Sequence, residues 1–214
     1  MMSTWDFAKE NNIFTGMPCG TENQQGFIEP ETQWFGIQCD TEKENIVGLT
    51  YNGTTFDYWP DIPPPLVGTL PDELFSGIPS LEMLQLKDNK LYGTLPPSLG
   101  THKKLKLLDL SSNSFRGFLP DPHTSGNLES LVAIDLSWNK LSGEIPKTYA
   151  TLNNLRSLDF STNSLVGIIP RDITALEFLE SLFLSENRLT GELPPTSGGS
   201  LKALGLSNND LSGE

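Results

Sequence analysis

The sequence predicts an α/β solenoid in which short parallel strands from successive coils stack on one another. The main observation is an internal repeat, because an asparagine recurs in the same frame of leucines at spacings of 24, 26, 24, 24 and 22 residues. Composition agrees, because only 36% of the 214 residues are hydrophobic, whereas glycine and proline together make up about a sixth of the chain. Thin coils with a narrow leucine stripe and frequent turns explain this composition. The recurring asparagines are Asn89, Asn113, Asn139, Asn163, Asn187 and Asn209.

Each repeat contains a segment that predicts a short strand buried on one face. Around Ile134 and Leu136, apolar and polar residues alternate with the period of two that such a strand requires. Parallel strands of successive coils would stack about 4.8 Å apart. The asparagine follows the strand where the chain turns inward, and its amide can both donate to and accept from backbone groups of neighbouring coils. We therefore expect it to satisfy backbone groups that would otherwise be buried without a partner.

A glycine follows each asparagine at a constant distance, and in the first five copies a proline follows that glycine. Glycine permits a turn or a close approach of two backbones. Proline, two or three positions further on, fixes an extended segment that cannot become a helix. The two residue types therefore predict where each coil turns on the way to the next strand. The glycines are Gly93, Gly117, Gly143, Gly167, Gly191 and Gly213.

From Leu81 to Pro96 the repeat reads L-x-x-L-x-L-x-x-N-x-L-x-G-x-L-P, and Leu141-Ser142-Gly143-Glu144-Ile145-Pro146 closes the best copy. This pattern resembles the leucine-rich repeat proteins, and more narrowly their plant-type subclass. The resemblance covers residues 45–214, as one degenerate repeat followed by six, the last of them incomplete. It implies a right-handed, curved solenoid with a parallel sheet on the concave face. A second set of short strands is expected after the glycine, and mostly 3₁₀ or irregular segments on the convex side.

Residues 1–44 resemble the cysteine-containing cap that precedes plant-type repeats. The end of that cap is matched by Trp34-Phe35-Gly36-Ile37-Gln38-Cys39, and Pro18-Cys19 supplies the earlier cysteine. The resemblance implies a disulfide between Cys19 and Cys39. A solenoid exposes an unpaired core face at its end, so a polar cap is expected to cover it.

The first repeat, residues 46–71, departs from the others. Its asparagine position is taken by Pro64, and the segment before it carries Phe56, Tyr58 and Trp59. Two interpretations stay open: these aromatic side chains cover the end of the core, or they form part of a recognition surface.

The resemblance also implies that ligands bind the concave face, whose residues can be read column by column. The position between two buried strand residues holds three successive aspartates, which would repel one another and could attract a cationic ligand. The alternative is that Leu-Asp-Leu-Ser is simply the common form of this repeat. The next column outward is mostly serine. Aromatic residues interrupt two polar columns, either as anchors for a ligand or as packing against a neighbouring coil. The predicted ligand-binding residues are Gln85, Lys87, Asp109, Asp135, Trp138, Asp159, Phe183 and Glu186.

Charge and motifs exclude several classes of function. A net charge of -13 argues against binding to nucleic acid or to an anionic membrane surface. No apolar run approaches the roughly 18 residues of a membrane span. The two histidines, His102 and His123, lie on different convex segments, and neither cysteine has a nearby histidine to act as a base. We therefore expect no enzyme activity, no cofactor, no metal site and no contact of this segment with a membrane.

The leading hypothesis is a recognition module that binds a protein, peptide or glycan on its concave face. Similarity to ectodomains of plant-type receptor-like kinases and receptor-like proteins implies signalling or defence, with any membrane anchor downstream of this segment. One alternative is a secreted inhibitor that resembles polygalacturonase inhibitors. Another is an ice-binding surface, because a regular row of Ser and Thr hydroxyls could match a lattice.

Two features predict an extracellular or cell-surface location. Asn52-Gly53-Thr54 is a sequon for N-glycosylation, and a disulfide cap also belongs outside the cytosol. The first residues do not read as a secretory signal, which fits either a cytosolic chain or a mature or trimmed piece. At Glu214 the chain stops within a repeat without a capping segment, so we expect a fragment of a longer protein.

Overall fold

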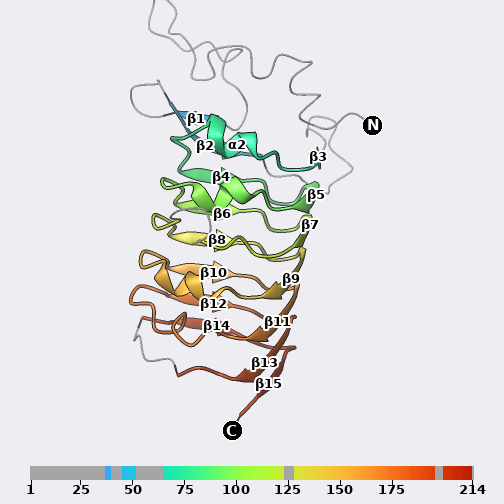
Figure 1. Cartoon of the computed structure of the whole chain (residues 1–214), viewed down its shortest axis with the longest axis vertical. Helices are drawn as coiled ribbons and strands as arrows, with labels where there is room; N and C mark the ends of the chain where they lie inside the picture. The colour runs from blue at the N-terminus through green and yellow to red at the C-terminus, as the bar shows by residue number, and fades with distance from the viewer. Residues whose placement is uncertain (1–36, 40–44, 52–64, 123–127, 196–199, 214) are drawn as a thin grey trace, which may run out of the picture.

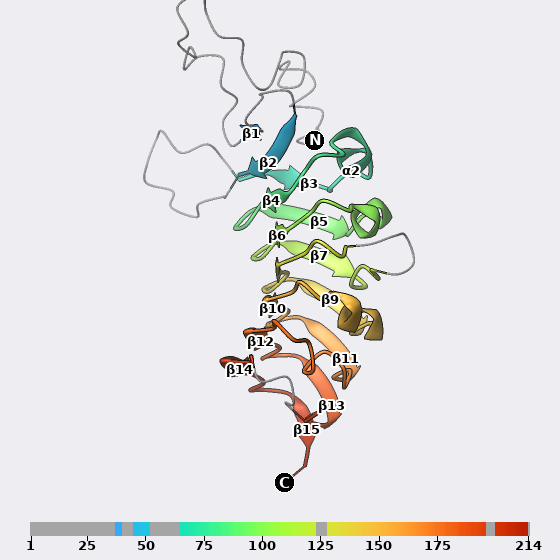
Figure 2. The ribbon, with the colours of Figure 1, turned by 90° about the vertical axis from the view of Figure 1, so that its left-hand side faces the viewer.

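The computed structural model describes residues 37–39, 45–51, 65–122, 128–195 and 200–213. They form a stack of coils that contributes strands to two sheets (Figure 1). Figure 2 shows the two sheets running down separate sides of this stack. The predicted repeat solenoid is confirmed.

The first sheet is the predicted concave sheet and has eight strands in the order β1-β2-β4-β6-β8-β10-β12-β14. From β2 onward the strands are parallel and in strict register, so that Leu84, Leu108 and Ile134 are direct neighbours across three coils. The central side chain is buried in β4, β6, β8, β10 and β12, because it points away from the open face of the sheet, whereas Leu204 in the last strand is exposed. The strands are β1 (Ile37–Cys39), β2 (Ile46–Thr50), β4 (Met83–Gln85), β6 (Leu107–Asp109), β8 (Ala133–Asp135), β10 (Ser157–Asp159), β12 (Ser181–Phe183) and β14 (Ala203–Gly205).

At the N-terminal end of this sheet, β1 pairs antiparallel with β2 and therefore runs opposite to all the following strands. Cys39 ends β1, but its predicted partner Cys19 lies outside the described residues, so the disulfide stays a prediction. Asn52 and the aromatic segment before Pro64 also lie outside them. The division into a cap at residues 1–44 and repeats at 45–214 stays a prediction as well.

The second sheet has seven parallel strands in the order β3-β5-β7-β9-β11-β13-β15. The expectation that these strands follow the glycine is wrong, because β5 to β13 begin directly after the asparagine and include the glycine. The residue before each asparagine has a positive φ, which completes the turn, so the chain is extended again at once. The strands are β3 (Val67–Gly68), β5 (Lys90–Thr94), β7 (Ser114–Gly117), β9 (Lys140–Glu144), β11 (Ser164–Ile168), β13 (Arg188–Glu192) and β15 (Asp210–Ser212).

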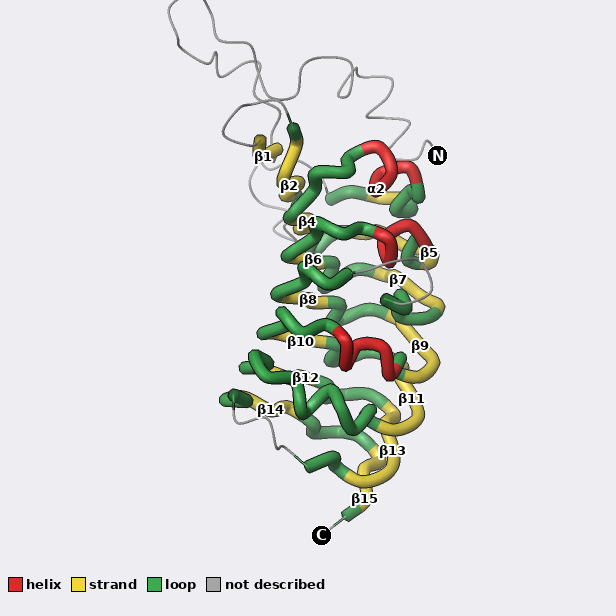
Figure 3. The backbone as a smooth tube through the Cα atoms, turned by 60° about the vertical axis from the view of Figure 1, so that its left-hand side comes forward, coloured by secondary structure: helices red, strands yellow, loops and turns green. Residues whose placement is uncertain are grey.

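The described helical segments are single turns on the return path of three coils (Figure 3). They are one α-helix, α2 (Glu73–Gly77), and two 3₁₀ turns, η2 (Pro97–Thr101) and η3 (Lys147–Thr151). Successive turns are linked, because the backbone N–H of Ser98 donates to Asp72 Oδ1 of the preceding coil at 3.0 Å. The expected 3₁₀ and irregular convex side is confirmed, with one short α-helix.

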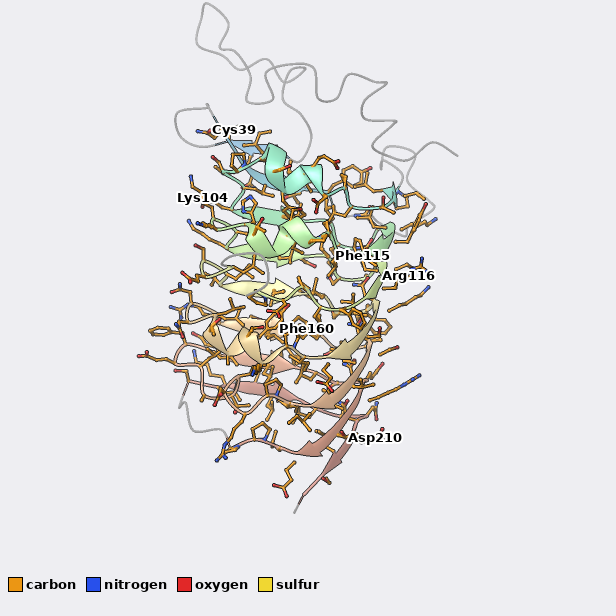
Figure 4. The ribbon with its side chains drawn as sticks, viewed as in Figure 1. Cys39, Lys104, Phe115, Arg116, Phe160 and Asp210 are labelled. Atoms are coloured by element: carbon orange, nitrogen blue, oxygen red, sulfur yellow. The ribbon has the colours of Figure 1, made fainter. Side chains whose placement is uncertain are left out.

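A single hydrophobic core runs through the stack from Leu70 to Leu189. Leucine supplies most of it, and each fully buried leucine contributes about 1.5–3 kcal/mol. Larger rings fill individual coils: Tyr149 meets Phe160 edge to face with 5.4 Å between ring centroids. Figure 4 labels Phe115 and Phe160, which lie in different coils of this core.

The asparagine ladder is present as predicted, and Asn139 shows its geometry. Its Nδ2 donates to the carbonyl oxygens of Leu110, Leu136 and Ser137 at 3.0, 3.2 and 3.1 Å. Its Oδ1 accepts from the N–H of Phe115 at 2.9 Å. One side chain therefore satisfies backbone groups of two adjacent coils, which fixes the strand register on the concave face.

Candidate functional site

Three aspartates form a row on the eight-stranded sheet. Asp109, Asp135 and Asp159 end β6, β8 and β10 and are direct register partners. Across adjacent strands this places like charges side by side, which is unfavourable by about 0.2–1 kcal/mol per pair. Within the described residues none of the three forms an ion pair. We call this row the aspartate ladder.

Local hydrogen bonds hold the carboxylates of the ladder in place. Asp135 Oδ1 accepts from the N–H of Ser137 at 2.9 Å and from its hydroxyl at 2.6 Å. Asp109 accepts the same pair from Ser111 at 3.1 and 2.6 Å. Each carboxylate is therefore oriented by the residue two positions later, and within the described residues its second oxygen accepts no hydrogen bond.

The serine column beyond the ladder differs from the expectation. Ser111 and Ser137 are only 2% and 6% exposed, because their hydroxyl groups turn back to the aspartates. Lys87, at the start of this column, is exposed. Ser161 and Ser185 are half-buried, and Ser207 is exposed. Because only part of the column faces solvent, it is not the regular row of hydroxyls that the ice-binding alternative requires.

The electrostatic environment of the ladder is most evident at Asp135. Burial raises the pKa of this carboxyl, and the charges of Asp159 and Asp109 raise it further. The two hydrogen bonds from Ser137 act in the opposite direction but do not cancel the effect. The ionised form is therefore disfavoured in the folded protein, and a cation placed over the ladder would relieve that cost.

Replacing Asp135 by asparagine should stabilise the fold at pH 7 by up to about 1 kcal/mol, because like-charged neighbours are removed while an oxygen remains for Ser137. Because the pKa of Asp135 is raised in the folded state, the ionised carboxylate destabilises the fold. This destabilisation grows as the pH rises through that pKa. The gain should vanish below about pH 4, where the carboxyl is neutral in both states. Thermal unfolding across this pH range measures it. Glu129→Gln, on an exposed turn before β8, should change little; a gain for Asp135→Asn that persists at low pH would contradict the explanation.

Trp138 lies next to the ladder, three residues after Asp135 on the same coil. Its side chain is 62% exposed. Its backbone has a φ of 55°, a left-handed conformation that costs a non-glycine residue about 1–2 kcal/mol. The other residues in this column, such as Ser112 and Thr162, share that conformation, so the turn itself imposes it. Neither the exposure of this position nor its backbone conformation favours a large aromatic ring there.

Phe183, the other aromatic interruption, behaves differently. Its ring is half-buried and lies over Gly205 of the next coil, where an added Cβ would come within 2.8 Å of Phe183 Cδ1. This contact supports the interpretation of Phe183 as packing on a neighbouring coil. The ring still borders the open face.

The remaining predicted site residues lie at the two ends of the ladder. Gln85 Oε1 accepts from the hydroxyl of Thr50 at 3.3 Å. Glu186 is exposed, and its Oε2 accepts from the hydroxyl of Thr162 at 3.2 Å. The structure therefore brings the eight predicted residues onto one sheet and its adjoining turns, with the ladder at the centre. The aspartate–serine contact was missed in the sequence, although its signal, aspartate followed by serine two positions later, recurs there.

The described residues offer few groups for other chemistry. His102 is buried, with Nε2 2.9 Å from the carbonyl oxygen of Ile78, and its ring packs against Phe75. His123 lies outside the described residues. Among those that are described, no group of three or more His, Cys, Asp or Glu side chains is arranged to hold a metal ion. That part of the chain also contains no helix with the length and apolar character needed to cross a membrane.

Comparison with known proteins agrees with this architecture. The Leucine Rich Repeat family matches residues 80–102, 104–125, 130–152, 154–176 and 178–199, which together exceed half of the chain. Receptor-like protein 13 of Arabidopsis thaliana is 43% identical over 68 residues, which are 32% of this chain and 6% of that protein.

Two solved structures extend the similarity. The crystal structure of a pollen receptor kinase 3 is 32% identical, with a TM-score of 0.71, and the match covers 85% of this chain and 82% of that one. A crystal structure of the Arabidopsis receptor kinase HAESA, solved with the peptide hormone IDA and the co-receptor SERK1, is 34% identical. Its TM-score is 0.67, and the match covers 72% of this chain and 26% of that one. This chain therefore spans only a small part of Receptor-like protein 13 and of the HAESA chain.

Proposed function

This chain belongs to the leucine-rich repeat family, and from that premise we propose that it is a non-catalytic recognition module of the receptor-like kind, located outside the cell or at its surface. Its ligand is a peptide or protein segment that carries a cationic side chain and lies across the aspartate ladder. The observation that supports this most is the row of three carboxylates in register, without an ion pair among the described residues, beside the exposed ring of Trp138.

The chemistry of the face favours a Lys or Arg side chain. A cation over Asp135 would lie between the charges of Asp109 and Asp159, and its charge would offset the burial and the repulsion that raise the pKa of Asp135. The ring of Trp138 offers an apolar surface for the stem of such a side chain and a π-face for its charge. Gln85 and Glu186 would supply hydrogen bonds at the two ends. The HAESA structure, solved with a peptide hormone, makes a peptide ligand the first choice over a glycan.

An array of synthetic peptides with basic, neutral and acidic versions of each sequence tests this function. We expect binding to require a Lys or Arg, because only a cation compensates the ladder. Charged hydrogen-bond pairs at an interface contribute enough that Asp135→Asn or Trp138→Ala should weaken such a peptide about tenfold or more. Isothermal titration of the best peptide measures this change.

The control is Thr190→Ala, an exposed substitution on the seven-stranded sheet that leaves the concave face intact. Circular dichroism shows whether each variant keeps the fold. Binding of acidic or neutral peptides alone, or unchanged affinity in both concave-face variants, would contradict the proposal. Binding to a glycan array without binding to any peptide would indicate a glycan ligand instead of a peptide.

A further inference from the structure

The outer face of the seven-stranded sheet carries an unusual share of exposed apolar surface. Among the described residues nine large hydrophobic side chains are exposed, and six of them lie on this sheet or directly beside it. Apolar side chains gathered on one face of a soluble protein indicate an interaction surface. The six are Val67, Tyr92, Phe118, Val166, Ile168 and Leu193.

Charge divides the same face into two halves. On β5, β7 and β9 the exposed side chains include Lys90, Arg116 and Lys140, and Arg116 is the direct register partner of Lys140. None of these three cations forms an ion pair within the described part of the chain. Two adjacent unpaired cations are unexpected in a protein with a net charge of -13. Something acidic outside the chain would compensate them.

The other half of the face is acidic. From the C-terminal end of β9 to β15 the exposed residues include Glu144, Glu192 and Asp210, against one cation, Arg188. Arg116 lies on β7 and Asp210 on β15, and Figure 4 labels both side chains, at different heights along the stack. Between the two halves, on or next to the central strands, lie Phe118 and Ile168.

We propose that this face is a self-association surface, on which two copies of the chain pack sheet against sheet about a two-fold axis. A two-fold rotation places the basic half of one copy over the acidic half of the other, twice in each dimer. The central apolar side chains, above all Phe118 and Ile168, then meet their counterparts near the axis. The same patch thus supplies both partners, as an isologous interface requires.

Charge and size together favour a second copy over an unrelated partner. Two chains of net charge -13 repel each other in most orientations, so only an arrangement that pairs opposite halves is favourable. Seven strands about 4.8 Å apart make a face about 30 Å long, and five residues make it about 17 Å wide. That area is below the roughly 800 Å² per partner of a standard interface, so the dimer is weak and reversible. It leaves the concave face open and does not depend on the function proposed above.

Sedimentation equilibrium of the full chain, over a concentration series up to about 1 mM, tests the proposal. The wild type should show a reversible monomer–dimer equilibrium. Arg116→Glu with Lys140→Glu makes the face predominantly acidic, and Glu144→Lys with Glu192→Lys makes it predominantly basic. Each double variant alone should raise the dimer dissociation constant at least about tenfold, because like charges then face each other. An equimolar mixture of the two should associate more tightly than either alone.

The matched control is Lys103→Glu with Lys104→Glu, which changes the net charge as much as the acidic variant does. Lys104 lies on the opposite side of the stack from Arg116 (Figure 4), so this control should keep the wild-type dissociation constant. Circular dichroism confirms that each variant is folded. A wild type that stays monomeric throughout, or an acidic-face variant that dimerises as the wild type does, would overturn the proposal.

Discussion

Replacing Asn139 by alanine should lower the free energy of unfolding by about 3 kcal/mol, because one side chain serves several buried backbone groups. Without the amide, the N–H of Phe115 loses its side-chain acceptor. The carbonyl oxygens of Leu110 and Leu136 each lose one of two amide donors and keep the other, from Asn113 and Asn163. A buried polar group left without a partner costs about 1–3 kcal/mol, and water entering the gap recovers part of that cost.

Urea or thermal unfolding of the full chain measures this loss. The matched control is Asn154→Ala, because the Asn154 amide is exposed and donates one bond, to the Glu129 carbonyl oxygen at 2.8 Å. Its loss should cost about 1 kcal/mol or less. Equal destabilisation by the two substitutions would mean that Asn139 contributes no more to stability than an exposed asparagine does.

The asparagine ladder also bears on binding. It joins each coil to the one before it at the point where the strand of the eight-stranded sheet ends. The aspartates precede these asparagines by four residues, so the spacing and register of the carboxylates depend on the same bonds. The fixed spacing of the proposed peptide-binding row is therefore a consequence of how the coils are held together.

The repeat positions were predictable from sequence because only one residue type fits each of them. Asparagine supplies donors and an acceptor on one short side chain, which Asn139 uses fully. Glycine is the residue that accepts a positive φ directly beside a side chain of the preceding coil. Strict repetition at 22 to 26 residues then gave the register of both sheets, including the row of aspartates.

The properties of individual site residues were harder to predict, because they depend on contacts between coils or over two residues. Whether Ser137 faces solvent depends on the carboxylate of Asp135, which turns the hydroxyl inward. Phe183 packs over Gly205, which lies 22 residues later in the same column of the sheet. The polarity of the residues in that column did not indicate this contact. The strands of the second sheet were expected too late in each coil because the turn ends before the asparagine, as the φ of 55° at Trp138 shows.

Gly143→Ala should destabilise the fold by about 2–4 kcal/mol, for two separate reasons. Gly143 has a φ of +84°, where an alanine costs about 1–2 kcal/mol. A Cβ there would also come within 2.5 Å of Phe118 Cδ1, and overpacking of this kind costs about 1–3 kcal/mol. Gly77→Ala is the control, because nothing lies within 4 Å of the added Cβ and the residue ends a helix. It should be neutral or stabilising by up to about 1 kcal/mol.

A double-mutant cycle separates the two causes. Thr94 occupies the position of Phe118 in the preceding coil and lies over Gly117 with a methyl group, so Phe118→Thr is a substitution that the fold already contains. In that background Gly143→Ala should keep the cost of the positive φ and lose most of the cost of the clash. A coupling of about 1 kcal/mol or more between the two sites is expected, and additive effects would mean that Phe118 simply swings away. Because the ring of Phe118 is 76% exposed yet seated on this glycine, a large coupling would also show that the ring is held in place at the centre of the self-association surface.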